Sequence, residues 1–468
     1  MREYLKFYID GRWVDPVELT ALEVDNPATE AVAGRIALGG TADVDRAVQS
    51  ARRAFPSWSQ SSRQDRLDVL QALLTEYRKR ERDIAEAITE EMGAPAELAA
   101  GPQTQLGSYH LLTAIDVLKN FEFCRQQGAT LVAHEPIGVC GLITPWNWPI
   151  NQIAVKVYPA LATGCTVVLK PSEVAPFSAQ IFTEIVHAAG VPAGVYNMVF
   201  GTGESVGQAI SRHPDIDMVS FTGSTRAGVD VARNAAPTVK RVTQELGGKS
   251  ANIVLDDAAF AGSVSAGVAA MMSNSGQSCN APSRMLVPKS RMAEAVSIAR
   301  ETAEQAQLGP VASRVQFDRI QGLIAEGIAE GAAVVAGGPG RPAGVAHGYY
   351  VRPTVFADVT NDMTIAREEI FGPVLCVQGY DDLDDAVAIA NDTEYGLAGY
   401  VSGADLEGAR ALARRLRAGW ISINHAFDMN APFGGYKRSG NGREWGEAGF
   451  HEYLETKSVL GHSPEASD

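Results

Sequence analysis

The sequence predicts an α/β protein with a doubly wound, Rossmann-type parallel sheet, followed by a second α/β unit. From about residue 137, short apolar runs rich in β-branched residues alternate with amphipathic stretches of helical length. The same alternation starts again after the Gly247-Gly248 pair. Parallel strands need crossover connections, which are usually helices, so this spacing favours a parallel sheet covered by helices. A chain of 468 residues is long enough for about three folding units.

The elements before and within the first unit follow from charge and hydrophobic spacing. Residues 41–98 predict helices, because Asp43 and Asp45 mark a helix start and leucines recur at helical spacing from Leu67 to Leu74. The polar stretch 118–135 shows little helical periodicity and predicts a protruding hairpin. Strands are predicted at 139–144, 166–169, 195–200 and 217–221, each followed by a stretch of helical length.

The second unit is predicted from the same two patterns. Its strands are expected at 251–255, 284–288, 332–336 and 373–378. Helices are expected at about 258–274 and 290–306, between successive strands. The last seven residues, 462–468, predict a loose tail because they contain no apolar pattern.

The composition excludes several classes of partner. Lys and Arg number 40 against 55 Asp and Glu, a formal net charge of −15, and an acidic surface repels a phosphate backbone. We therefore expect no nucleic acid partner. The N-terminus has no apolar targeting segment, and no run of about 18 apolar residues occurs, so we expect a cytoplasmic protein that does not bind membranes.

The cysteines and histidines argue against disulfides and metals. Five cysteines, an odd number, lie far apart and show no pairing rhythm, which favours a reducing compartment. The eight histidines form no HxxxH or HExxH pair, and none stands beside a cysteine at ligand spacing. The sequence predicts no metal site.

Three short motifs follow predicted strands where a nucleotide could bind. The glycine patterns 201–207 and 223–228 each follow a strand and open a helix, whose first N–H groups could meet a phosphate. Neither is a true GxGxxG, and each taken alone is more often a tight strand-to-helix turn. Residues 170–173 (KPSE) offer an ammonium and a carboxylate at a strand end, although a solvated turn is the simpler interpretation in isolation.

Cys279 is the best candidate for a nucleophile. It lies in the small, polar segment SGQSCNA, whereas Cys140, Cys165 and Cys376 lie in aliphatic runs typical of buried structural cysteines. A thiol with a pKa near 8.5 is only a few per cent thiolate at pH 7, so it needs a nearby base or a positive helix end. The alternative, a buried small hydrophobe, stays open from the pattern alone.

Glu245 and Asn147 are candidate partners for that thiol. Glu245, in the segment QELGGK, is a candidate base, although a single carboxylate before a glycine pair is ordinarily at the surface. Asn147 stands between two prolines and two tryptophans in TPWNWP, which could freeze its amide as an oxyanion donor. An asparagine that closes a turn is the alternative.

Taken together, the motifs identify the chain as similar to the aldehyde dehydrogenase superfamily of NAD(P)-dependent enzymes, from about residue 7 to 459. Any one motif could arise by chance, but seven in one order could hardly do so. They are PWNWP at 145–149, KPSE at 170–173, FTGS at 221–224, ELGGK at 245–249, GQSC at 276–279, EEIFGP at 368–373 and PFGGYKRSG at 432–440.

The resemblance implies an architecture of three parts. Residues 1–115 and 137–247 would form an NAD-binding domain, and residues 248–445 a catalytic domain. Residues 116–136 and 446–468 would form a small β oligomerisation element and the tail, making a homodimer or homotetramer. These boundaries come from the resemblance and not from composition.

The resemblance also assigns roles to residues. Cys279 is expected as the nucleophile, Asn147 as the oxyanion donor, Glu245 as the general base and Lys156 as a lysine near the active site. The expected cofactor-binding residues are Ile143, Thr144, Pro145, Trp146, Lys170, Ser172, Glu173, Gly203, Phe221, Thr222, Gly223, Ser224, Leu246, Gly247, Glu369 and Phe371.

These roles imply oxidation of an aldehyde to a carboxylic acid through a thiohemiacetal and a thioester on Cys279. NAD is expected rather than NADP, because Glu173 would repel the extra phosphate. The substrate is expected to be a medium-chain, aryl or oxo-acid semialdehyde. Its tunnel would be formed by Asn151, Gln152, Val155, Ser278, Asn280, Phe427 and Phe433.

Three other functions stay open at this point. A CoA-acylating aldehyde dehydrogenase would use the same thioester with a thiol in place of water, and the presence of Glu245 argues against it. A cysteine hydrolase or esterase would need no NAD. A non-enzymatic protein of the same fold would be expected to have lost Cys279, Glu245 or Asn147, and all three are present.

Overall fold

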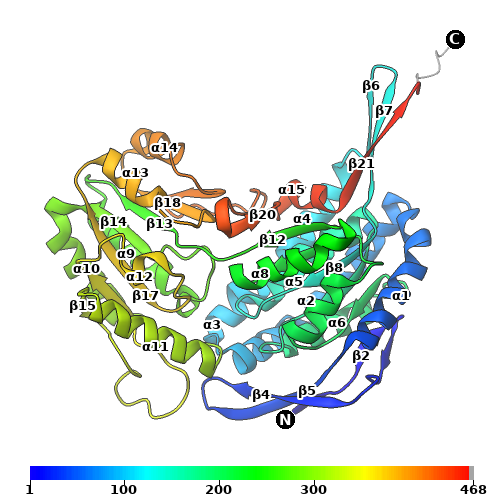
Figure 1. Ribbon diagram of the computed structural model, residues 1–468, viewed down its shortest axis with the longest axis horizontal. Coiled ribbons are helices and arrows are strands. Elements are labelled where there is room, and N and C mark those ends of the chain that lie inside the picture. The colour runs from blue at the N-terminus through cyan, green and yellow to red at the C-terminus, as the bar shows by residue number, and fades with distance from the viewer. Residues whose placement is uncertain (463–468) are drawn as a thin grey trace.

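The computed structural model describes residues 1–462. The predicted tail at 462–468 therefore lies outside the described residues, except for His462. Within residues 1–462, no helix is both long and apolar enough to cross a membrane. Figure 1 shows two α/β halves side by side, with a hairpin projecting from one of them.

The first half contains a sheet of eight strands in the order β20-β12-β11-β8-β9-β10-β2-β3. From β8 the chain adds β9 and β10 on one side, then returns to add β11 and β12 on the other, all in parallel. The order reverses between β8 and β11, and ligands of such sheets bind outside the strand carboxyl ends at that point. The strands are β2 (Phe7–Ile9), β3 (Arg12–Val14), β8 (Val139–Ile143), β9 (Thr166–Lys170), β10 (Tyr196–Met198), β11 (Met218–Thr222), β12 (Arg241–Glu245) and β20 (Gly440–Asn441).

Helices cover both faces of this sheet. Every residue of β8, β9 and β11 is buried, as expected for parallel strands with helices on both sides. Helix α5 is buried along its whole length and starts at a proline, which suits the first helical position. The helices predicted within 41–98 are present as α1 and α2. The helices of this half are α1 (Thr41–Ser59), α2 (Arg63–Met92), α3 (Ala96–Leu98), α4 (Thr104–Asn120), α5 (Pro149–Thr163), α6 (Phe177–Ala188), α7 (Gln208–Arg212) and α8 (Thr225–Ala235).

The second half repeats the doubly wound pattern in a sheet of seven strands, β15-β16-β17-β14-β13-β18-β19. All pairs are parallel except β15 with β16. The four predicted strands are present, and β16, β18 and β19 were not predicted. The strands are β13 (Ala251–Val254), β14 (Arg284–Pro288), β15 (Ala333–Ala336), β16 (Thr354–Ala357), β17 (Val374–Tyr380), β18 (Ala398–Ser402) and β19 (Trp420–Ile423). The helices are α9 (Phe260–Met272), α10 (Met292–Glu304), α11 (Arg314–Ala329), α12 (Thr364–Arg367), α13 (Leu383–Asn391) and α14 (Leu406–Ala413).

The projecting hairpin consists of β6 (Cys124–Gln127) and β7 (Thr130–Pro136), and β21 (Leu454–Leu460) from the chain end pairs with β7. The prediction placed the hairpin from residue 118, which is wrong at its start, because α4 continues to Asn120. Leu118 of that last turn is fully buried and holds it in helical form. A further sheet of β1 (Arg2–Tyr4), β5 (Ala31–Leu38) and β4 (Thr20–Asn26) was not predicted. Near the end, α15 (Gly446–Glu452) leads into β21.

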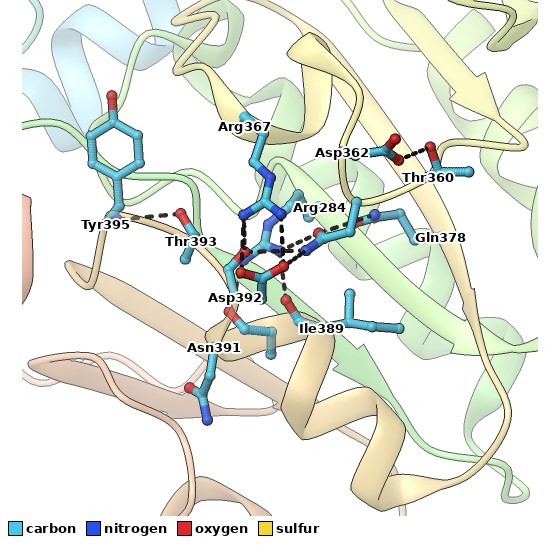
Figure 2. A network of polar contacts seen from close by, with 12 residues as sticks. Arg284, Thr360, Asp362, Arg367, Gln378, Ile389, Asn391, Asp392, Thr393 and Tyr395 are labelled. Carbon is cyan, nitrogen blue, oxygen red and sulfur yellow. Dashed lines mark hydrogen bonds and ion pairs between the residues drawn. The ribbon is translucent and has the colours of Figure 1, made fainter.

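A buried arginine forms hydrogen bonds to several segments at the amino-terminal edge of the second sheet. Arg284, the first residue of β14, is 1% exposed, and Figure 2 shows its guanidinium among carbonyl oxygens. It donates to the backbone oxygens of Lys249, Ile389 and Ala390 and to Oδ1 of Asn361, at 2.8–3.2 Å. A buried cation is tolerated where its N–H groups are paired in this way. Arg284 therefore fixes the segment that precedes β13 against α13.

Candidate active site

The loop that carries Cys279 is a tight, left-handed turn between α9 and β14. Asn274, Ser275 and Gly276 have φ values of 52°, 54° and 70°, a conformation that non-glycine residues rarely adopt in succession. A side chain at Gly276 would collide with the carbonyl of Gly372, so only glycine fits there. This turn fixes where the polypeptide presents the sulfur of Cys279.

Buried amides hold Asn147 against the same loop. Its backbone oxygen accepts hydrogen bonds from Nε2 of Gln103 at 3.1 Å and from Nδ2 of Asn274 at 2.9 Å. Its own Nδ2 donates to the backbone oxygen of Gln277 at 3.1 Å. An amide nitrogen carries two hydrogens, so one anchors the side chain and the second stays available.

Glu245 is not the surface carboxylate that its local sequence favours. It ends β12 with 4% of its surface exposed, and its Oε2 has no hydrogen-bond partner within residues 1–462. Burial, followed by the charge of Glu444, raises the pKa of Glu245 well above its usual value. A carboxylate with a raised pKa is a stronger base once deprotonated.

Burial also raises the pKa of the Cys279 thiol, and the carboxylates of Glu369 and Glu245 raise it further. These surroundings therefore favour the thiol over the thiolate. A base or a positive charge brought next to the sulfur would favour the thiolate.

Two cavities meet at these residues. A narrow cleft and a wide cavity share Thr222, Glu245 and Cys279 in their walls. Besides these three, the narrow cleft is lined by Pro145, Trp146, Asn147, Gly223, Ser224, Leu246, Gly247, Gln316, Arg319, Glu369 and Phe371. The wide cavity is lined largely by apolar side chains, among them Leu98, Leu106, Tyr109, Trp148, Phe427, Met429, Phe433 and Trp445.

The narrow cleft opens at the switch point of the first sheet. Pro145 and Trp146 follow β8, and Gly223 and Ser224 follow β11. Ser224 caps α8, its Oγ accepting a hydrogen bond from the backbone N–H of Ala227 at 3.3 Å. The start of a helix of this length favours a phosphate, so the residues fit a dinucleotide.

The opposite wall of the cleft carries a carboxylate and an aromatic ring. Oε1 of Glu369 accepts a hydrogen bond from the N–H of Gly248 at 2.9 Å, and a side chain at Gly247 would collide with the same carboxylate. Burial raises the pKa of Glu369 to about 7. The ring of Phe371 meets Trp146 edge to face, with centroids 5.4 Å apart. Glycine at 247 therefore leaves room for this hydrogen-bonding carboxylate in the wall of the cleft.

Lys170 and Glu173 form an ion pair beyond the cleft, at the carboxyl end of β9. Nζ of Lys170 lies 2.6 Å from Oε2 of Glu173, and Lys170 is buried while Glu173 is partly exposed. Seven of the expected cofactor-binding residues do not line the narrow cleft. These are Ile143, Thr144, Ser172, Gly203 and Phe221 around the strand ends, together with this pair.

Lys156 lies close enough to Glu245 to lower the pKa of that carboxyl, without lining either cavity. It is fully buried, donates to Oγ of Ser220 at 2.9 Å and forms an ion pair with Glu444. Glu444 lines the wide cavity and was missed, although it follows the glycine-rich motif at 432–440 by four residues. Gln316 and Arg319 of α11 were also missed, because no local pattern marks them.

Comparison with known proteins identifies the family of the chain. Residues 13–459 match the model of the aldehyde dehydrogenase family. The chain belongs to this family. The predicted resemblance and fold class are thus confirmed, and the protein is an aldehyde dehydrogenase with a Rossmann-type sheet.

Several relatives cover almost the whole aldehyde dehydrogenase chain. A 3-succinoylsemialdehyde-pyridine dehydrogenase of a Pseudomonas species is 53% identical over 474 residues, 99% of each chain. A cysteine-to-alanine mutant of aldehyde dehydrogenase C of Pseudomonas syringae, complexed with NAD+ and octanal, superimposes with a TM-score of 0.97 at 53% identity, covering 98% of this chain and 97% of that one. The aldehyde dehydrogenase of Mycobacterium tuberculosis, complexed with NAD+, has a TM-score of 0.95 at 39% identity, covering 98% of each chain.

The tunnel expected for the aldehyde dehydrogenase is largely present as the wide cavity. Asn151, Gln152, Asn280, Phe427 and Phe433 line it. Two expected members do not: Val155 packs in a buried cluster with Trp420 and Trp445, and Ser278 accepts a hydrogen bond from the indole of Trp148 at 2.8 Å. The width of the cavity therefore does not depend directly on the small side chain at 155.

Proposed function

We propose that the protein oxidises aldehydes to carboxylic acids with NAD, using Cys279 as the nucleophile. One observation carries this proposal: Cys279 and Glu245 line both cavities, so a substrate in one and a dinucleotide in the other meet at the sulfur. Asn147 lines the narrow cleft at the same point.

The first step forms a bond between the sulfur of Cys279 and the aldehyde carbon. The thiol of Cys279 loses its proton to water, and as the resulting thiolate attacks, the carbonyl electron pair moves onto oxygen. The free N–H of Asn147 and the backbone N–H of Cys279 donate to that oxyanion. Removing one such donor typically lowers the rate by about 10²- to 10³-fold.

The narrow cleft fits NAD, because it joins a helix start, two glycines and the buried carboxylate of Glu369. The chemistry that NAD supplies when bound is acceptance of a hydride, which leaves a thioester on Cys279. The Lys170–Glu173 pair favours NAD over NADP, since Glu173 engages the lysine and would repel the extra phosphate of NADP.

The last step hydrolyses the thioester. Glu245 removes a proton from water, the hydroxide oxygen bonds to the acyl carbon, and the carbon–sulfur bond breaks to release the acid and the Cys279 thiolate. Lys156 keeps Glu444 in an ion pair, which limits the repulsion between the two carboxylates. Its role is to position charge and not to react.

The wide cavity supports medium-chain aliphatic and aryl aldehydes as substrates, because its wall is largely apolar. Aldehyde dehydrogenase C, with octanal bound, and the semialdehyde dehydrogenase are consistent with this class. We also propose that residues 1–115 and 137–247 bind NAD and that residues 248–445 form the catalytic domain. Residues 116–136 with the segment from 446 would join subunits in a homodimer or homotetramer, in the cytoplasm.

The proposed function is tested by the absorbance of NADH. Purified protein is mixed with NAD and, separately, with octanal, benzaldehyde and succinic semialdehyde, with and without CoA. We expect NADH from octanal and benzaldehyde without CoA. A strict requirement for CoA, or ester hydrolysis without any NADH formation, would contradict the proposal.

A further inference from the structure

One asparagine in the wide cavity is held by a histidine that the proposed reaction does not use. His110 lies on α4 and Asn151 on α5, two helices that pack together. Nε2 of His110 lies 2.8 Å from Oδ1 of Asn151, and both side chains are buried, at 5% and 7% exposure. The little surface that Asn151 exposes lies in the cavity wall.

The histidine determines which end of the amide faces the cavity. Oδ1 of Asn151 can only accept, so at this contact the hydrogen is on Nε2 of His110, and burial lowers the pKa of His110 to about 4, which leaves the ring neutral near pH 7. The amide nitrogen then points away from His110. Within residues 1–462, this nitrogen makes no hydrogen bond to the protein. Trp445 packs on the imidazole at a centroid distance of 5.4 Å and keeps the ring in place.

The other polar groups of the cavity wall are either engaged by a partner, charged, or not held in one orientation. The indole N–H of Trp148 is engaged by Ser278, and Glu245 and Glu444 are carboxylates that repel a substrate oxygen. The neutral polar side chains Gln105, Tyr109, Gln152, Thr222, Ser273 and Asn280 also line the cavity, but no hydrogen bond within the described chain orients any of them. Asn151 thus stands out as an oriented, neutral donor in a largely apolar wall.

We propose that the Asn151 amide recognises a carbonyl oxygen of the substrate that is separate from the reacting aldehyde, so that oxoaldehydes are preferred over plain alkanals. The inference rests on the proposed aldehyde oxidation and specifies its substrate class. Asn147 precedes α5 and lines the narrow cleft beside Cys279, whereas Asn151 lies in the first turn of α5 and lines the wide cavity. The second oxygen therefore lies several atoms from the aldehyde carbon, as in a 4-oxoalkanal.

The preference has a physical basis in the cost of an unpaired donor. A site built to donate a hydrogen bond loses that bond when an apolar chain covers it. His110 is a positioning residue in this scheme, because it acts only by fixing the amide of Asn151.

The test compares nonanal with 4-oxononanal, using kcat/KM from NADH formation. Because the ketone also changes the reactivity of the aldehyde, the measured quantity is the oxo-to-plain ratio of the variant relative to the wild type. We expect Asn151→Leu and the isosteric Asn151→Asp to lower this ratio about tenfold. A wild-type ratio in both folded variants would overturn the inference and leave the proposed function intact.

Two further variants separate recognition from a general disturbance of the wall. His110→Phe should lower the ratio, and combining it with Asn151→Leu should lower it no further, since both remove one donor. Gln152→Met removes the neighbouring amide and should retain the ratio. Losses that multiply in the double variant, or an equal loss in Gln152→Met, would contradict the role of Asn151. No NADH from either aldehyde in the wild type would refute the proposed function itself.

Discussion

The two sheets of the molecule have the same doubly wound winding but use opposite edges at the site. The first sheet contributes from its carboxyl edge: Trp146 follows β8, Ser224 follows β11 and Glu245 ends β12. The second contributes from its amino edge, since Cys279 precedes β14 and Phe371 precedes β17. The site is formed where these two edges face each other.

This difference between the two sheets shows that a general rule about the fold locates only part of the site. The carboxyl-edge rule for open α/β sheets finds the narrow cleft of the first sheet. Applied to the second sheet, it leads to a hollow lined by small residues such as Gly262, Ser402 and Gly403, which lies away from Cys279. Chemistry must therefore be argued from side chains and not from the winding alone.

The largest effect is expected from the second sheet's contribution. Cys279→Ser should lower aldehyde oxidation by about 10³-fold or more, because an alcohol is a far weaker nucleophile than a thiolate. NAD binding, followed by quenching of tryptophan fluorescence, should persist. Normal turnover by the serine variant would show that the second sheet does not supply the nucleophile.

A smaller effect, which falls on steady-state turnover and not on the first turnover, is expected from changing Glu245 of the first sheet. Glu245→Gln should keep a first-turnover burst of NADH, while steady-state turnover falls by about 10²- to 10⁴-fold. The pKa of Glu245 is raised, so wild-type turnover should rise with pH as this carboxyl loses its proton well above pH 4.5. The variant should lack that rise. Equal loss of burst and turnover would place Glu245 in the first step only.

The smallest effect concerns the far end of the cleft. Glu173→Gln removes a charge that would lie near the extra phosphate of NADP and frees Lys170 from its ion pair. Like charges about 4 Å apart cost about 1 kcal/mol in water, so the NADP-to-NAD ratio of kcat/KM should rise about fivefold. An unchanged NADP-to-NAD ratio would show that Glu173 does not discriminate between the two cofactors.

The sequence predicts the winding of the first sheet well, because its strands are buried on both faces and form continuous apolar runs. It predicts the N-terminal strands poorly, since half-exposed strands such as β4 carry charged residues and show no clean run. The hairpin start was also misplaced, because the burial of Leu118 is a tertiary effect that polar neighbours conceal.

The site residues were found through their combination and not one by one. The local pattern alone favours a surface carboxylate at Glu245, and only the tertiary fold buries it and raises its pKa. Gln316 reaches the cleft from α11, far along the chain from every motif. Val155 was misjudged because successive helical residues point in different directions, so neighbours of a lining residue need not line the same cavity.

The contact between Gly276 and the carbonyl of Gly372 constrains how this molecule can diversify. Any methyl group there would push the sulfur-bearing turn away from the segment that carries Phe371. Substitutions that alter the substrate pocket can instead be made on α4, on α5 and among the aromatic residues around Phe427, which surround the wide cavity without touching that contact. The contact at Gly276 therefore constrains the position of the nucleophile, whereas the substrate selectivity of the cavity can change by mutation.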